Sequence, residues 1–170
     1  DPAGVRERVR WAMELAGLPF EAYKDRFCTA LSGGEQRKAA LAGVLALQPE
    51  LLLLDEPAAG LDPHSRGELL ETLRRLQLER GTALMVATHD LDLAAGWADR
   101  MLVLDRGRVV AQASPRDILG RPDLCAAFGL EPPAVTRLFW RLRGAGADLP
   151  GDVMTVAEAA SVLNEVLARA

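Results

Sequence analysis

The chain has 170 residues, of which 49% are apolar; this proportion suffices for a hydrophobic core and argues against a disordered chain. Its formal net charge of −4 provides no broad positive field, so we expect no nucleic-acid partner. No apolar run approaches the length of a transmembrane helix, and two cysteines without metal-ligand spacing indicate a reduced compartment.

Two helices and a linker are predicted in the first part of the chain. Apolar residues recur at helical spacing over residues 5–16, and a glycine and a proline follow directly. Residues 23–30 have the composition of a linker. A second helix is expected from about Gly34, and Pro49 closes it.

The following segment alternates between strand and helix patterns. Residues 51–54 form a wholly apolar run between two prolines, which predicts a strand buried on both faces, as in a parallel sheet. A helix over 65–79, a second buried strand over 82–88 and a short helix over 90–98 follow. This alternation predicts an α/β fold with a doubly wound parallel sheet.

The last predicted strands, 101–104 and 109–111, flank a turn and indicate an antiparallel hairpin at the edge of that sheet. After residue 114 the pattern becomes helical, with an apolar stripe over residues 135–142. We therefore predict two parts, an α/β lobe over residues 1–114 and a helical region over residues 115–170.

The first chemical motif is LSGGEQ, residues 31–36, where the second helix begins. Ser32 and Glu35 alone have the spacing of a capping box. Two successive glycines in a first helical turn cost about 1 kcal/mol each relative to alanine. Their benefit is that a ligand can approach bare backbone N–H groups, and a helix N-terminus favours a phosphate.

The second motif is LLLLDEP, residues 51–57, which places Asp55 and Glu56 at the C-terminal end of the predicted strand. Active sites of α/β sheets lie at this end. Adjacent carboxylates repel each other, and a divalent cation relieves the repulsion. One carboxylate can hold Mg²⁺ through water, while the other takes a proton from an attacking water.

Two further segments indicate a functional site only through their order relative to the first two motifs. The sequence AGLDP, residues 59–63, is by itself an ordinary turn. His89 follows the strand that ends at Thr88, which again indicates the catalytic edge of the sheet, although a single histidine is more often structural. The other histidine, His64, stands in a polar turn and is expected to be solvated.

In this order and spacing, the four motifs resemble the ATP-binding subunits of ABC transporters, over about residues 31–90. The resemblance implies part of a P-loop NTPase (ABC ATPase) lobe. It identifies a signature motif that contacts the γ-phosphate of an ATP held by the opposite subunit: Leu31, Ser32, Gly33, Gly34 and Glu35. It also identifies a D-loop, which communicates across the dimer: Ala59, Gly60, Leu61 and Asp62.

The same resemblance assigns the hydrolysis residues. Asp55 is the Walker B aspartate that serves Mg²⁺, Glu56 is the general base, and His89 is the switch histidine at the γ-phosphate. The sequence departs from the family at Glu35, where glutamine is most common. We expect the phosphate contact to survive, slightly weakened by the acid.

A second resemblance, to energy-coupling factor transporters, concerns the predicted helix over residues 5–16, residues 41–63 and, mainly, residues 130–163. Such transporters import vitamins or transition-metal ions such as cobalt and nickel. The implied partners are a second ATPase subunit and a transmembrane transporter subunit, at the cytoplasmic face of the membrane. In that family the C-terminal region helps to hold the ATPase subunits together. The stripe over residues 135–142 has this role or, as we favour, packs on its own domain.

Two other classes of protein share part of this pattern. Chromosome-structural and DNA-repair ATPases also carry these motifs in a C-terminal lobe, but a coiled coil should then precede Leu31, where the sequence predicts one short helix. A non-catalytic regulatory fragment has no physical need to retain Asp55, Glu56 and His89 together.

The motif G-x-x-x-x-G-K-[ST] is absent from the sequence. Without it the β- and γ-phosphates have neither a backbone cradle nor a lysine. We therefore expect an N-terminally truncated ATPase that hydrolyses no ATP alone, and Glu56-dependent turnover by the pure chain would contradict this. We also expect exposed apolar surface, with marginal stability or self-association.

Overall fold

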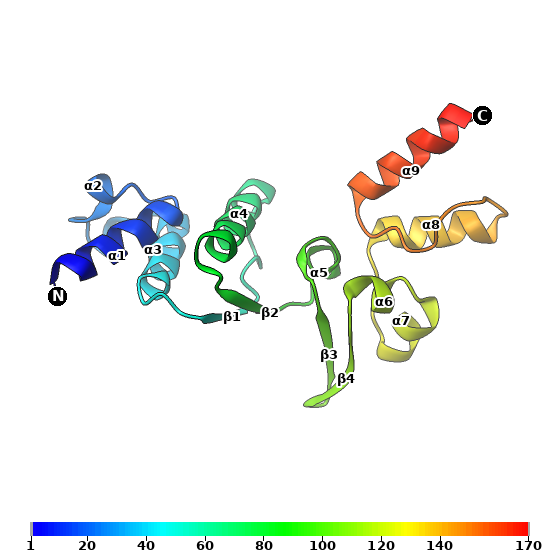
Figure 1. Ribbon diagram of the computed structural model, residues 1–170, viewed down its shortest axis with the longest axis horizontal. Coiled ribbons are helices and arrows are strands. Elements are labelled where there is room, and N and C mark those ends of the chain that lie inside the picture. Colours follow the sequence, from blue (N-terminus) through cyan, green and yellow to red (C-terminus); the bar gives the residue numbers. More distant parts are fainter. Residues whose placement is uncertain (1, 170) are drawn as a thin grey trace. The chain divides into compact units, whose positions relative to one another are not determined.

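The computed structural model describes residues 2–169, which fall into two compact units, Asp1–Ala87 and Thr88–Ala170 (Figure 1). The boundary between the units lies directly after a strand. The division that the sequence suggests at residue 114 stays a prediction.

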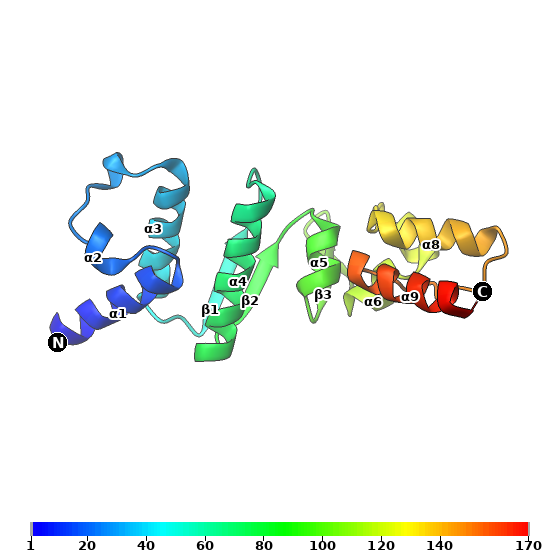
Figure 2. The ribbon, with the colours of Figure 1, turned by 90° about the horizontal axis from the view of Figure 1, so that it is seen from above.

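The first unit begins with a group of helices. These are α1 (Pro2–Leu15), α2 (Phe20–Tyr23), a 3₁₀ turn (Cys28–Ala30) and α3 (Gly33–Leu45). Helix α1 packs against α3, with Leu15, Leu18 and Leu45 buried (Figures 1 and 2). Both long helices occur where the apolar periodicity predicts them, and the predicted linker contains the 3₁₀ turn.

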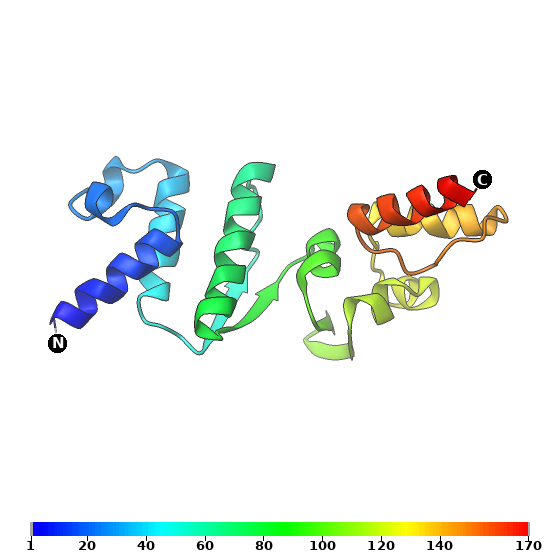
Figure 3. The ribbon, with the colours of Figure 1, turned by 45° about the horizontal axis from the view of Figure 1, so that its top comes forward.

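A parallel pair of strands follows, β1 (Leu51–Asp55) and β2 (Ala83–Ala87), joined through α4 (Pro63–Arg80). Helix α4 lies along the sheet (Figure 3). The buried leucines here are Leu52, Leu73 and Leu76. The register pairs Asp55 with Ala87, so the C-terminal ends of the two strands meet at one edge of the sheet.

The prediction that these strands are buried on both faces is wrong. Leu53 is 64% exposed and Met85 is 50% exposed, whereas Leu52 is buried. Successive side chains of a strand point to opposite faces of the sheet. Among the described residues of this unit, α4 covers only one of those faces, so alternate apolar residues face outward.

The second unit combines a hairpin with five helices in its described part. Its elements are α5 (Leu91–Trp97), β3 (Met101–Asp105), β4 (Arg108–Ala113), α6 (Pro115–Leu119), α7 (Pro122–Phe128), α8 (Ala134–Gly144) and α9 (Val156–Arg169). The antiparallel hairpin is confirmed. Arg106 and Gly107 both have positive φ, 48° and 76°, as a two-residue type I′ turn requires.

The hairpin forms a two-stranded sheet within the second unit, and its predicted place at the edge of the parallel sheet stays a prediction. The α/β fold class, with a parallel sheet, an antiparallel hairpin and helices, is confirmed. Each sheet within residues 2–169 contains two strands, so the predicted doubly wound arrangement is not formed by these residues alone.

The centre of the apolar stripe over residues 135–142 packs against other residues of the second unit. Phe139 on α8 is fully buried against Val153 and Ala159 of the following segment. Beside it, the buried hydroxyl of Thr136 donates to the carbonyl of Val153 at 2.6 Å. Leu138 remains 49% exposed, so only part of the stripe is covered.

Substitution of Leu73 tests the assignment of the core. Leu73→Ala removes a fully buried side chain of α4 and should lower the free energy of unfolding by about 2–5 kcal/mol. Leu78→Ala on the same helix, where the side chain is 80% exposed, should change it by less than about 0.5 kcal/mol. Urea unfolding monitored by circular dichroism measures both, and equal losses would show that α4 packs through another face.

Candidate active site at the signature helix

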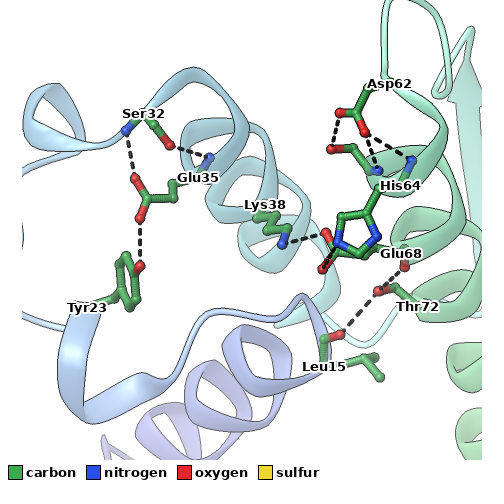
Figure 4. A network of polar contacts seen from close by, with 10 residues as sticks. Leu15, Tyr23, Ser32, Glu35, Lys38, Asp62, His64, Glu68 and Thr72 are labelled. Atoms are coloured by element: carbon green, nitrogen blue, oxygen red, sulfur yellow. Dashed lines mark hydrogen bonds and ion pairs between the residues drawn. The ribbon is translucent and has the colours of Figure 1, made fainter.

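Helix α3 begins with a reciprocal capping box. The Glu35 N–H donates to Ser32 Oγ at 3.3 Å, and the Ser32 N–H donates to Glu35 Oε2 at 2.7 Å (Figure 4). A helix start leaves its first N–H groups without intrahelical partners. Residues 32–35 carry four such N–H groups, and the capping box satisfies those of Ser32 and Glu35. The remaining two N–H groups are those of Gly33 and Gly34.

Gly33 and Gly34 are not required by packing. Both are exposed, and a Cβ added to either would meet no atom within 4 Å among the described residues. Neither has the positive φ that would demand glycine. Two glycines in a first turn therefore weaken α3 without a steric reason inside the chain. What they provide is open access to two backbone donors at the positive end of a helix dipole.

The Glu35 side chain lies on the side of α2. Besides the Ser32 N–H, its carboxylate accepts a hydrogen bond from the Tyr23 hydroxyl at 2.6 Å (Figure 4). These hydrogen bonds lower the pKa of Glu35 to about 2, and the bond from Tyr23 is the largest cause. The same hydrogen bond raises the pKa of the Tyr23 hydroxyl. Both carboxylate oxygens of Glu35 are thus engaged with donors of the chain itself.

The Walker B candidates stand at the end of β1. Asp55 is the last residue of the strand and is exposed. Glu56 follows with a φ of 44°, and its N–H still donates to the carbonyl of Ala87 at 2.8 Å. A left-handed conformation costs a residue with a side chain about 1–2 kcal/mol, and such strain concentrates at functional sites. The turn changes the course of the backbone directly after the two carboxylates.

The donors at this edge suit Mg²⁺ in one respect. Carboxylate oxygens are hard ligands, and Mg²⁺ commonly takes one or two of them and completes its shell with water and phosphate oxygens. Within residues 2–169, no group of three or more His, Cys, Asp or Glu side chains is arranged to hold a metal ion. The chain therefore fits the predicted role of a single carboxylate, that of Asp55, and not that of a complete protein cage.

The predicted D-loop lies between β1 and α4. Gly60 has a φ of 69°, which glycine adopts without strain. Asp62 is the N-cap of α4, where Oδ1 accepts from the N–H groups of His64 and Ser65 at 3.0 and 3.1 Å. The Ser65 hydroxyl also donates to the Asp62 carboxylate. This hydrogen bond is the largest cause of the lowered pKa of Asp62. Asp62 thus fixes the start of α4, while Ala59 and Gly60 remain exposed.

Arg37 joins the signature helix to this loop. Its guanidinium donates to the carbonyl of Pro57 and, at 3.3 Å, to that of Ala59. Neither Arg37 nor Tyr23 is among the residues predicted for the site. Arg37 follows Gly33 by one helical turn, which is a weak signal, whereas nothing in the linker composition marks Tyr23.

A cleft of about 550 Å³ in the first unit brings parts of three motifs together. Gly34, Asp55 and Leu61 are among its lining residues. Beside it, Lys38 pairs with Glu68 of α4 at 2.9 Å, which connects α3 to α4 (Figure 4). The structure thus brings residues of the predicted signature, Walker B and D-loop motifs to one cleft. Leu31 is the C-cap of the 3₁₀ turn that precedes α3. Its carbonyl accepts a hydrogen bond from the side-chain amide of Gln36.

His89 belongs to the second unit. It is exposed and lies between Thr88 and Asp90, the N-cap of α5. The Asp90 N–H donates to the Thr88 hydroxyl at 3.1 Å, and the Asp90 carboxylate accepts from the Leu93 N–H at 2.9 Å. These bonds fix the backbone on the C-terminal side of His89. The role of His89 stays a prediction.

The Glu35 contacts predict an acid-sensitive contribution to stability. The folded pKa of about 2 lies below the ordinary value of 4.5, so this contribution is complete above about pH 4.5 and is lost as the pH falls towards 2. In Glu35→Gln the group no longer titrates. The loss of stability between pH 4.5 and 2, measured by urea unfolding, should therefore be smaller than in the parent chain. An identical pH dependence in both would contradict the assigned contacts.

Comparison with known proteins places these motifs in a family. A family model described as "AAA domain, putative AbiEii toxin, Type IV TA system" matches residues 20–95. The energy-coupling factor transporter ATP-binding protein EcfA2 of Symbiobacterium thermophilum is 43% identical over 166 residues, 98% of this chain and 57% of that protein. EcfA2 of Clostridium perfringens is 36% identical over 163 residues, 96% of this chain and 57% of that protein.

Solved structures agree with this result. The cbiO1 protein of Clostridium perfringens, part of the ABC transporter complex cbiONQ, matches with a TM-score of 0.64 and 32% identity, over 86% of this chain and 53% of that one. The dimeric bacterial ABC transporter cassette MJ0796 matches with a TM-score of 0.55 and 30% identity, over 65% of this chain and 47% of that one. No helix within residues 2–169 has the length and apolar character needed to cross a membrane.

The chain spans 57% of the length of the two curated relatives named above. Within that span its sequence and its fold lead to the same family. Over nearly its whole length the chain is similar to ABC-type ATP-binding subunits of energy-coupling factor transporters, and it matches just over half of the length of those proteins.

Proposed function

We propose that the chain supplies the signature half of an ATP site whose P-loop half belongs to an opposite subunit. One observation carries the proposal. In a chain similar to this family, the capping box of α3 occupies the N–H groups of Ser32 and Glu35 and leaves those of Gly33 and Gly34 exposed. Two adjacent amides at a helix N-terminus suit the terminal phosphate of a nucleotide. The Ser32 hydroxyl accepts from Glu35 and retains its own proton to donate.

The hydrolysis residues are proposed by their place in the fold and by the family. Asp55 would hold Mg²⁺ through water, and the ion would neutralise phosphate charge. Glu56 is the general base that takes the proton of the attacking water. His89 donates to the γ-phosphate. The strained turn at Glu56 supports this assignment, because it sets the base directly beyond the Walker B carboxylate at the sheet edge.

The wider setting is also a proposal. A second ATPase subunit and a transmembrane subunit are the partners, and ATP binding and hydrolysis energise the import of a vitamin or a transition-metal ion from the cytoplasmic face. In support, MJ0796 is described as dimeric, cbiO1 as part of a transporter complex, and the curated relatives as energy-coupling factor subunits. The sequence has no G-x-x-x-x-G-K-[ST] motif, so the 170 residues alone should show no ATP turnover.

Substitution of the glycines tests the proposed phosphate contact. The chain is combined with an ATP-binding subunit that carries a P-loop, and ATP turnover by the mixture is measured. Gly33→Leu and Gly34→Leu should lower the turnover at least about 100-fold, because a side chain then blocks the amides from the phosphate. The chain alone serves as the blank.

Gly43→Leu is the matched control. Gly43 lies on the same helix, is exposed, and also has no atom within 4 Å of an added Cβ. Its substitution should leave the turnover unchanged and should not lower the unfolding midpoint, because leucine has a higher helix propensity than glycine. Turnover that is indifferent to leucine at both Gly33 and Gly34 would refute the proposed function.

A further inference from the structure

Tyr23 contacts the signature helix from a separate element. It is the last residue of α2, and its hydroxyl reaches Glu35 Oε1 at 2.6 Å while the Ser32 N–H reaches Oε2 at 2.7 Å (Figure 4). The Glu35 carboxylate therefore lies between two donors. One of them belongs to the capping box and the other comes from outside α3.

An acid at this position creates a problem for a phosphate site. The features of a helix N-terminus that favour a phosphate also favour a carboxylate. A Glu35 side chain free to move would compete for the N–H groups of Gly33 and Gly34, and its charge would repel an incoming phosphate. A second donor that fixes the carboxylate elsewhere removes the competition.

We propose that Tyr23 is a positioning residue of the signature helix, whose hydroxyl holds the Glu35 carboxylate on the side of α2 and keeps the amides of Gly33 and Gly34 available. This role rests on the proposed function, because it concerns the same phosphate site. It explains how the chain accommodates an acid directly after the two glycines. Tyr23 acts through Glu35 and does not itself touch the nucleotide.

The contact is present over the whole neutral pH range. The pKa of Glu35 is lowered to about 2 and that of Tyr23 is raised, so acceptor and donor keep their protonation states between these limits. The Tyr23 ring also stacks under the guanidinium of Arg26, at 4.5 Å from the ring centroid. Phenylalanine preserves this stacking and removes only the hydroxyl, which makes Tyr23→Phe a specific probe.

The test measures kcat and KM for ATP in the complete gene product assembled with its partner subunits. Tyr23→Phe should lower kcat/KM about three- to tenfold, mainly through KM, as expected for the loss of one hydrogen bond to a charged group. In a Glu35→Gln background the same substitution should change kcat/KM by less than about twofold, because a neutral amide does not repel a phosphate. The quantity compared is the ratio of kcat/KM with and without Tyr23→Phe, taken separately in the parent chain and in the Glu35→Gln variant.

Glu21→Gln is the matched charge control. Glu21 also lies on α2, but its carboxylate pairs with Arg10 and Lys24, away from the signature helix. This variant should leave kcat/KM unchanged. Unfolding midpoints of all variants establish that they fold.

Two results would overturn the positioning role. An equal fall of kcat/KM in both backgrounds means that Tyr23 acts only through packing, and an unchanged kcat/KM in the Glu35 background means that the hydroxyl has no role. Gly34→Leu in the same assay separates this from the proposed function. If Gly34→Leu is silent, both ideas fail; if it abolishes turnover and Tyr23→Phe is silent, only the positioning role fails.

Discussion

The first turn of a helix carries N–H groups that the helix itself cannot satisfy, and α3 satisfies only some of them. Ser32 and Glu35 occupy each other's backbone N–H groups and leave the two glycine amides between them exposed. A chain that needed only a stable helix would place residues with better helix propensity at both glycine positions. The arrangement lowers the stability of α3 and leaves two backbone N–H groups accessible at the positive end of the helix dipole.

The other motifs of the first unit depend on the placement of this helix. Arg37 ties α3 to the loop after β1 through two carbonyls, and Lys38 ties it to α4 through Glu68. That loop carries the strained Glu56 and the proposed D-loop. These contacts would pass a displacement of α3 on to the segment that holds Asp55 and Glu56, the proposed hydrolysis residues of this unit.

Local chemistry made much of this predictable from sequence. The spacing of Ser32 and Glu35 predicted the capping box, and the strand and helix periodicities predicted β1, α4 and the hairpin. Burial of the strands was not predictable, because an apolar run reports the preference of its residues and not the number of layers around them. That is why the exposure of Leu53 and Met85 differed from expectation.

Contacts between distant segments were also beyond the sequence. Tyr23 and Arg37 make their contacts with partners that only the folded chain brings near; the sequence gives a weak signal for Arg37 and none for Tyr23. The assignments of Asp55, Glu56 and His89 rest on motif order and family resemblance, and the structure adds the sheet edge and the backbone strain at Glu56.

Amide hydrogen exchange at the start of α3 tests the central claim most directly. It is measured in the chain assembled with its partner subunits, in a Glu56→Gln variant that lacks the proposed general base, so that added ATP should persist. On addition of nucleotide, exchange of the Gly33 and Gly34 amides should slow at least about tenfold, while those of Ser32 and Glu35, already hydrogen-bonded, change little. Glycine amides that exchange equally fast with and without bound ATP would contradict the account.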